Sequence, residues 1–289
     1  MNYLYYPGCS LTGSAREYDL AIRSVMAAAG ATLTEIEDWT CCGASAAAPV
    51  SHLLALSLGA RNLALAEKMT AEGEILVPCS ACYLNLKRAH TALNQHAEDR
   101  TRINAALSAV DLSASGRGRV RHLLDVLATD LGSDDLAGHM PRSLAGLVVA
   151  PYYGCQCLRP FVEFDDPERP VSMTALIQAT GADVFAWEMG ARCCGASLVS
   201  TRPSVGLKRV TAILRAARGA DLIVTVCPMC QMNLDAWQAR ASRAAGEDLS
   251  ISVLYLPQLL GLAMGLSKEA LGLNLNLAVM EPFLEKIAM

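Results

Sequence analysis

Three cysteine motifs occur twice in this chain, in the same order and at nearly constant spacing. A single cysteine comes first, a Cys-Cys-Gly second and a Cys-x-x-Cys third, and the second copies follow the first at offsets of 146, 152 and 148 residues. The similarity extends beyond the cysteines, because Asn85 and Asn233 each lie three residues after the last cysteine of their copy. Three ordered motifs recurring at nearly one offset indicate an internal duplication.

The duplication predicts two similar domains, an N-terminal one over residues 1–140 and a C-terminal one over residues 141–289. A chain of 289 residues with 53% apolar residues can form the cores of two such domains. We place the boundary between Ser133 and Leu144, where Gly132 to Asp135 predicts a turn.

Strand-like and helix-like segments alternate in both halves. Short apolar or β-branched runs precede the cysteine motifs at residues 32–36, 74–77, 147–149, 183–185 and 222–226. Ser14 and Glu17 form a capping-box pattern for a helix that Gly30 would end, and a second helix is expected from Ser51 to about Thr70. This order predicts an α/β fold with two similar halves, each with a mainly parallel sheet. The cysteines would then lie past the carboxyl ends of the strands, where open α/β sheets bind ligands.

Each half supplies five motif cysteines, which is more than a structural zinc or an ordinary cubane cluster needs. Five thiolates, two of them adjacent, suit a larger or unusual iron–sulfur cluster, and Gly43 and Gly195 would let the backbone approach it closely. Cys157 is left over and is expected to be a spare, partly buried thiol. His52 and His122 are expected to be solvated or to pack. The predicted ligands are Cys9, Cys41, Cys42, Cys79, Cys82, Cys155, Cys193, Cys194, Cys227 and Cys230.

Composition and missing motifs exclude several classes of function. A net charge of −4 and only 5% aromatic residues argue against a nucleic-acid partner. No secretory signal opens the chain and no apolar run is long enough to span a membrane, so we expect a reducing, cytoplasmic location. The apolar segments 251–266 and 274–287 are candidates for partner docking or for the chain's own core. Without a ferredoxin motif or a dinucleotide fingerprint, we expect no flavin or NAD in this chain, and a partner protein must exchange electrons with it.

The residues that carry these motifs resemble a known family over nearly the whole chain. They include Tyr6 to Ser10, Glu37 to Gly43, Pro78 to Cys82, and Cys194-Gly195 followed by Cys227 to Cys230. The pattern is similar to the cysteine-rich "CCG" domain family, and most of all to the B subunit of heterodisulfide reductase.

This resemblance implies two noncubane [4Fe-4S] clusters, one per half, with a disulfide reduced or formed between them. It implies an oxidoreductase acting on sulfur groups, as the catalytic subunit of a heterodisulfide reductase-like complex. The partners would be a ferredoxin-like [4Fe-4S] protein, the C component of such a complex, and a flavin-containing protein, its A component. The substrate would be a thiol and disulfide, coenzymes M and B in a methanogen, or a persulfide in bacterial sulfur metabolism.

The chain departs from the family after its second isolated cysteine, where Gln156 replaces the usual histidine and Cys157 adds a thiol. Gln156 and Arg159 are candidate cleft residues, and Arg159 would meet an anionic substrate unless it forms a surface salt bridge. Two alternatives remain open. One is an iron–sulfur electron-transfer subunit of a lactate- or glycolate-type dehydrogenase complex without thiol chemistry. The other is a zinc-stabilised scaffold.

Overall fold

Two four-stranded sheets form the centre of the molecule, one in each half of the chain. A computed structural model describes residues 1–288. The first sheet contains β1 (Asn2–Tyr5), β2 (Thr32–Glu35), β3 (Glu74–Val77) and β4 (Arg119–His122), in the order β2-β1-β3-β4. The second contains β5 (Val148–Tyr152), β6 (Asp183–Val184), β7 (Leu222–Thr225) and β8 (Ser252–Tyr255), in the equivalent order β6-β5-β7-β8.

Every strand pair in these sheets is parallel, with registers such as Leu4 opposite Ile75 and Val149 opposite Leu222. Parallel strands need helical crossovers, which here cover the sheets and bury most central strands on both faces. The predicted α/β fold with two similar, mainly parallel halves is therefore confirmed. The boundary between residues 140 and 141 stays a prediction.

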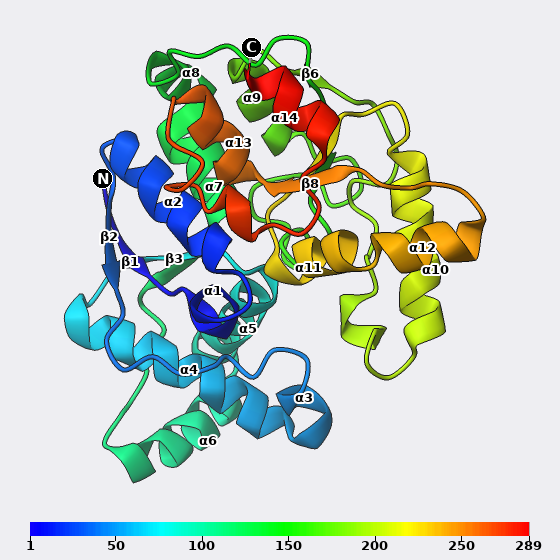
Figure 1. Cartoon of the computed structure of the whole chain (residues 1–289). Helices are drawn as coiled ribbons and strands as arrows, with labels where there is room; N and C mark the ends of the chain where they lie inside the picture. Colours follow the sequence, from blue (N-terminus) through cyan, green and yellow to red (C-terminus); the bar gives the residue numbers. More distant parts are fainter. Residues whose placement is uncertain (289) are drawn as a thin grey trace.

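The helices follow the duplicated order with local differences (Figure 1). In the first half they are α1 (Gly8–Thr12), α2 (Arg16–Ala28), α3 (Ala47–Val50), α4 (His52–Met69), α5 (Ser80–Gln95), α6 (Ala97–Leu107), α7 (Leu123–Val126) and α8 (Gly132–Gly138). In the second half they are α9 (Ser172–Ala179), α10 (Pro203–Ala216), α11 (Pro228–Ala236), α12 (Gln238–Ala245), α13 (Leu256–Ala263) and α14 (Glu281–Ala288).

Two local predictions were wrong. Helix α2 begins at Arg16 without a side-chain cap, because Glu17 is buried and hydrogen-bonds to Tyr255 instead of reaching back to Ser14. The predicted turn at Gly132 is the start of α8, which continues from a π-helical turn over Leu127–Leu131. By contrast, α4 begins where expected, with the Ser51 hydroxyl accepting a hydrogen bond from the Leu54 amide.

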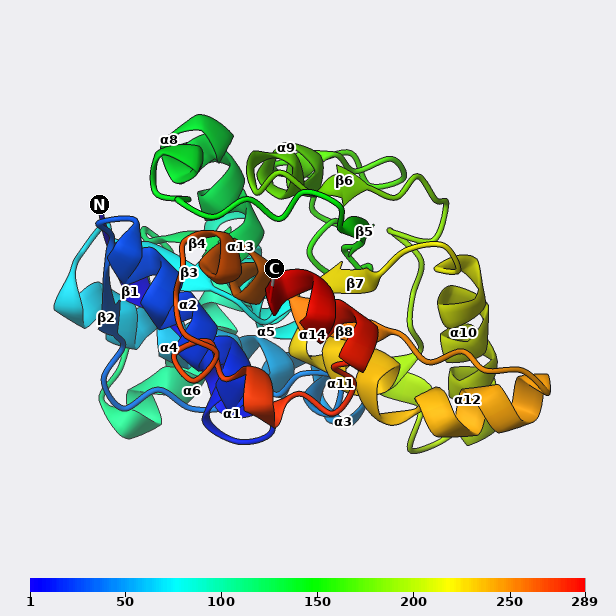
Figure 2. The ribbon, with the colours of Figure 1, turned by 45° about the horizontal axis from the view of Figure 1, so that its top comes forward.

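The helices that follow the last strand of each half pack against the other half. Helix α13 follows the last strand of the second half but packs on α2 of the first, as Figures 1 and 2 show. In the same way, α7 and α8 follow the last strand of the first half and pack on α9 of the second. A continuous buried cluster consequently includes side chains of both halves, among them Val25, Leu127, Ile177 and Leu260.

The first apolar segment near the carboxyl end packs onto the chain's own core, and the second does so in part, since its Leu275 and Leu277 are exposed. Residues 252–263 form β8 and α13 and are entirely buried, while Phe283 and Ile287 of α14 are 1% and 2% exposed. Lys286 fixes α14 further through a 2.7 Å ion pair with Asp221. Within residues 1–288, no helix has both the length and the apolarity required to cross a membrane.

Candidate metal centres

The fold brings each set of five cysteines to the carboxyl edge of its own sheet. In the first set Cys9 lies in α1 after β1, Cys41 and Cys42 lie in the loop after β2, and Cys79 and Cys82 lie at the start of α5 after β3. The second set follows β5, β6 and β7 in the same way. The expected placement past the strand ends is therefore confirmed.

The thiols of the first set approach one another in pairs. The Sγ atoms of Cys9 and Cys41 are 3.7 Å apart, and those of Cys42 and Cys82 are 3.3 Å apart. Cys79 hydrogen-bonds to Cys82 and lies within electrostatic range of Cys9, which joins the two pairs into one group.

The second set repeats this arrangement. The Sγ atoms of Cys194 and Cys230 are 3.4 Å apart, matching the pair of Cys42 and Cys82. Cys155 hydrogen-bonds to Cys193, and Cys227 hydrogen-bonds to Cys230. Among residues 1–288, no three Cys, His, Asp or Glu side chains are grouped as ligands of a single metal ion.

The repeated asparagines brace the Cys-Cys-Gly loops. Asn85 Nδ2 donates to the carbonyl oxygens of Cys42 and Ala44 at 3.1 and 2.9 Å. Asn233 Nδ2 donates to the Cys194 carbonyl at 3.0 Å. One turn of helix separates each asparagine from the last cysteine, so it anchors the Cys-Cys-Gly loop to the helix that carries that cysteine.

Two glycines outside the Cys-Cys-Gly motifs leave space beside the sulfurs. Gly8 and Gly154 have φ angles of +71° and +73°, and a Cβ there would lie 2.9 Å from Cys82 Sγ and 3.0 Å from Cys230 Sγ respectively. Both glycines precede the isolated cysteine of their set. A cradle that excludes even a methyl group, lined by five soft thiols, fits an iron–sulfur cluster in each half.

The expected role of Gly43 and Gly195 beside a cluster stays a prediction. Both have positive φ, as a turn glycine should, and a Cβ on Gly43 would meet Ala47 and Leu58, while one on Gly195 would approach Gly206 and Arg209. These glycines therefore also permit the loops to pack against neighbouring helices. The Gly195 amide donates to Cys193 Sγ at 3.3 Å, so its backbone does approach a sulfur of the second set.

Replacing Gly154 with alanine should destabilise the second centre alone. The left-handed conformation costs an L-residue about 1–2 kcal/mol, and the new methyl group would also press on Cys230. We expect a lower urea midpoint and iron loss confined to the second set. Gly138→Ala is the matched control, because a Cβ there meets nothing within 4 Å and the residue has no positive φ. Equal effects of both substitutions would contradict this role of Gly154.

Hydrogen bonds between paired thiols lower the pKa of one sulfur and raise that of the other. The thiol of Cys82 lowers the pKa of Cys42 to about 7, that of Cys155 lowers the pKa of Cys193 to about 6, and that of Cys230 lowers the pKa of Cys227 to about 6. The donor partners have raised pKa values. In these three pairs, the sulfur with the lowered pKa more readily becomes a thiolate, the form that binds metal, and metal binding would release the partner's proton.

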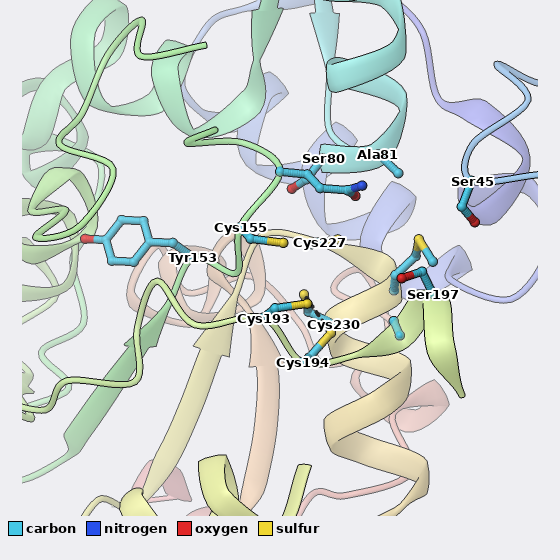
Figure 3. A pocket seen from close by; sticks show the side chains of 13 residues that line it. Ser45, Ser80, Ala81, Tyr153, Cys155, Cys193, Cys194, Ser197, Cys227 and Cys230 are labelled. Atoms are coloured by element: carbon cyan, nitrogen blue, oxygen red, sulfur yellow. Dashed lines mark hydrogen bonds between the residues drawn. The ribbon is translucent and has the colours of Figure 1, made fainter. Parts of the chain in front are cut away.

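A small pocket opens between the halves beside the second set (Figure 3). Its lining combines the cysteines and Gln156 of the second set with seven residues that sequence reasoning missed. Three of the seven come from the first half and four from the second: Ser45, Ser80, Ala81, Tyr153, Ala196, Ser197 and Met229. Cys9, Cys41 and Cys193 are exposed, whereas the last two cysteines of each set are buried, so each centre opens on one side. A small molecule could therefore reach the second centre from the boundary between the halves.

The structure separates the two candidate cleft residues. Gln156 lines the pocket. Arg159 does not, because its guanidinium donates to Glu168 at 2.6 Å and to the carbonyls of Pro167 and Ala191. Its charge still contributes to lowering the pKa of Cys193, as does that of Arg209, which sequence reasoning did not identify.

Cys157 is fully buried and stands apart from the thiol pairs. Its Sγ donates to the Tyr153 carbonyl at 3.3 Å, and burial raises its pKa to about 12. The thiol is more buried than the sequence predicted, and its role as a spare thiol stays a prediction.

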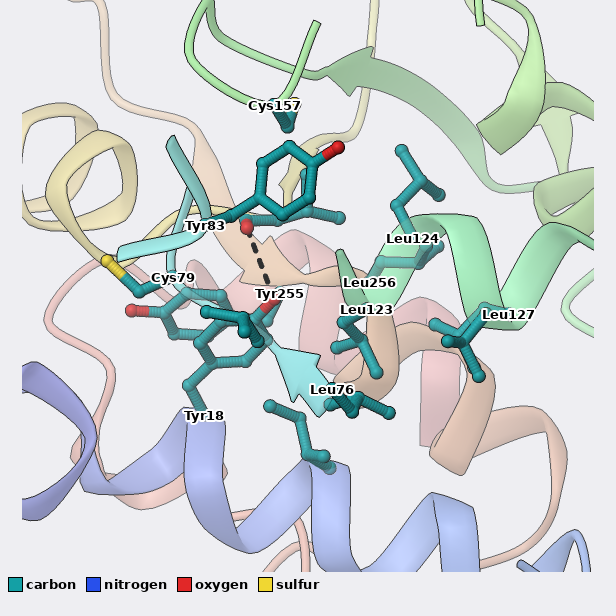
Figure 4. Packing of buried hydrophobic residues seen from close by; sticks show 14 of the residues in the cluster. Tyr18, Leu76, Cys79, Tyr83, Leu123, Leu124, Leu127, Cys157, Tyr255 and Leu256 are labelled. Carbon is teal, nitrogen blue, oxygen red and sulfur yellow. Dashed lines mark hydrogen bonds between the residues drawn. The ribbon is translucent and has the colours of Figure 1, made fainter. Parts of the chain in front are cut away.

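Tyr18 links the two centres through the core. Its hydroxyl lies 3.4 Å from the carbonyl oxygen of Pro78 and 3.2 Å from that of Val226, and these residues immediately precede Cys79 and Cys227. The ring stacks on Tyr255 with centroids 4.0 Å apart and planes 6° from parallel (Figure 4). One buried side chain therefore contacts the residues that precede Cys79 and Cys227, one in each set.

Duplicated parallel sheets and two thiol sets define a class, the proteins with paired cysteine-rich domains. The model of the family "Cysteine-rich domain", abbreviated CCG, matches residues 3–87 and 149–235. The chain belongs to this family, with the domain present twice.

Curated proteins of similar sequence show more closely which members of this class the chain resembles. A chain from Wolinella succinogenes, "8-methylmenaquinol:fumarate reductase membrane anchor subunit", is 38% identical over 95% of this chain and 96% of its own. The B subunit of a ferredoxin/F(420)H(2)-dependent CoB-CoM heterodisulfide reductase from Methanosarcina acetivorans is 34% identical over 80% and 78%. A protein from Archaeoglobus profundus, named as similar to the B subunit of heterodisulfide reductase, is 29% identical over 93% and 92%.

One solved structure shares the fold. A hypothetical protein from Helicobacter pylori superposes with a TM-score of 0.79 at 16% identity over 96% of this chain. The present chain spans about half of that protein, 52% of its length. By their names, the relatives from Wolinella and Methanosarcina are subunits of reductases.

Proposed function

We propose that this chain carries one noncubane [4Fe-4S] cluster on each cysteine set and catalyses reversible cleavage of a sulfur–sulfur bond. The pocket between the halves carries this proposal. It brings thiols of the second set and residues of the first half to one opening, through which a substrate sulfur would reach the second centre. The ten predicted ligands, five per set, would hold the clusters.

The reaction consumes two electrons and two protons and yields two thiols from one disulfide. Two clusters would supply one electron each, which avoids a free thiyl radical. Residues of this chain would position the substrate: Gln156 and Ser197 offer hydrogen bonds inside the pocket, and Arg159 and Arg209 lend positive charge near Cys193. The electrons would come from a ferredoxin-like partner, itself reduced by a flavin-containing one.

A second candidate is electron transfer without thiol chemistry. The relative from Wolinella favours it, since its 38% identity extends over nearly both chains and its name is that of a component of a quinol:fumarate reductase. Gln156 in place of the usual histidine points the same way. In this role the chain would pass single electrons between partner proteins, as in lactate- or glycolate-type dehydrogenase complexes.

Paramagnetic resonance on anaerobically purified protein separates the two candidates. We expect the spectrum of the oxidised protein to change on addition of coenzyme M, a small anionic thiol. The alcohol analogue 2-hydroxyethanesulfonate should have no effect, because an alcohol is a poor ligand for iron. Full iron content with a spectrum indifferent to the thiol would overturn sulfur chemistry and leave the electron-transfer role.

A further inference from the structure

His122 and Ser80 form a buried contact in the first half that the proposed chemistry does not use. His122 ends β4 and Ser80 begins α5, and they are 0% and 1% exposed. The Ser80 Oγ and His122 Nε2 atoms are 3.2 Å apart. The imidazole is further held between Tyr83 and Phe164.

The backbone determines which nitrogen of His122 carries the proton. The Leu124 amide donates to Nδ1 at 3.2 Å, so Nδ1 must have a free lone pair. Burial lowers the pKa of His122 to about 3, and the ring is neutral. Its one proton is therefore on Nε2, which donates to Ser80 Oγ. The Ser80 hydroxyl hydrogen is left free to be donated elsewhere.

The sulfurs of the second set are the available acceptors. Ser80 lines the same pocket as Cys155 and Cys227, as Figure 3 shows for its side chain, and its hydroxyl contributes to lowering the pKa of Cys227. Cys157 stays protonated and already donates to Tyr153. A thiolate ligand is the stronger acceptor, so the hydroxyl of Ser80 should point to Cys227.

The duplication provides no equivalent donor from the second half to the sulfurs of the first set. Pro228 follows Cys227 as Ser80 follows Cys79, and a proline side chain donates no hydrogen bond. Tyr255 ends β8 as His122 ends β4, but it hydrogen-bonds to Glu17. The first set therefore lacks a donor from these positions, and the two centres differ.

We propose that Ser80, oriented by His122, donates a hydrogen bond across the boundary between the halves to Cys227, and so raises the reduction potential of the second cluster. Hydrogen bonds to cluster sulfurs tune reduction potentials, and they stabilise the more negative, reduced state. The inference rests on the proposed function only in requiring a cluster on each set.

A redox titration of the full-length protein followed by paramagnetic resonance tests this role. Signals are assigned to the centres with Cys9→Ser and Cys155→Ser. In Ser80→Ala we expect the equilibrium between the oxidised and reduced second cluster to shift roughly tenfold toward the oxidised form, about 59 mV for one electron. The potential of the first cluster should stay unchanged.

Conservative variants distinguish positioning from packing. Ser80→Thr keeps a hydroxyl and should restore the potential. His122→Phe keeps the stacking on Tyr83 and Phe164 but removes the donor, and should lower the potential of the second cluster by less than Ser80→Ala does.

Different experimental results would overturn this inference and the proposed function. Full iron with unchanged potentials in both Ser80→Ala and His122→Phe would overturn the role of Ser80, as would equal shifts of both clusters. A wild-type protein without iron would instead overturn the proposed function.

Discussion

Replacing Cys42 with serine should remove the iron of the first centre and leave the second intact. Cys42 is 1% exposed, lies 3.3 Å from Cys82 Sγ and accepts a hydrogen bond from the Ala44 amide. A serine hydroxyl is a harder and weaker ligand for iron than a thiolate. We expect the iron content to fall from about eight to about four atoms per chain. Metal analysis of anaerobically purified protein measures this directly.

Two further cysteine variants complete this test. Cys194→Ser should have the mirror-image effect, because Cys194 pairs with Cys230 at 3.4 Å as Cys42 pairs with Cys82. Cys157→Ser should keep all of the iron. An equal loss from Cys157→Ser, or no loss from Cys42→Ser, would contradict the assigned ligand sets.

Replacing Tyr18 with alanine should cause a large loss of stability. The ring is fully buried, stacks on Tyr255, and lies between the halves near both centres. Removing a buried aromatic ring costs about 3–5 kcal/mol in free energy of unfolding. The urea midpoint of the iron-loaded protein, followed by circular dichroism, should fall accordingly.

The variant Tyr18→Phe separates the ring from the hydroxyl. It keeps the stacking but removes the hydrogen bond to the Pro78 and Val226 carbonyls. We expect a loss of only about 1 kcal/mol. A Tyr18→Ala variant with an unchanged midpoint would show that the halves do not depend on this contact.

Much of the fold could be predicted from the sequence because the duplication marks equivalent positions. Strands β3 and β7 were recognisable as short apolar runs that end at a cysteine, and Asn85 and Asn233 stood out as repeated residues. Helix α4 was predictable because Ser51 is a conventional cap.

Other features depend on contacts between distant segments. Strand β4, with the sequence Arg-Val-Arg-His, looked polar, yet Arg121 is buried in ion pairs with Asp125 and Asp130. The capping box predicted at Ser14 does not form, because Glu17 contacts Tyr255, a residue far away in the sequence. The packing of the two halves on each other places Ser80 and His122 beside the second set, which spacing along the chain does not indicate.

The central claim is that the chain binds two iron–sulfur clusters, and its most direct test is metal and sulfide analysis of anaerobically purified protein. We predict about eight irons and about eight acid-labile sulfides per chain, with little zinc. Zinc with little iron and no labile sulfide would contradict the claim and leave a zinc-stabilised scaffold.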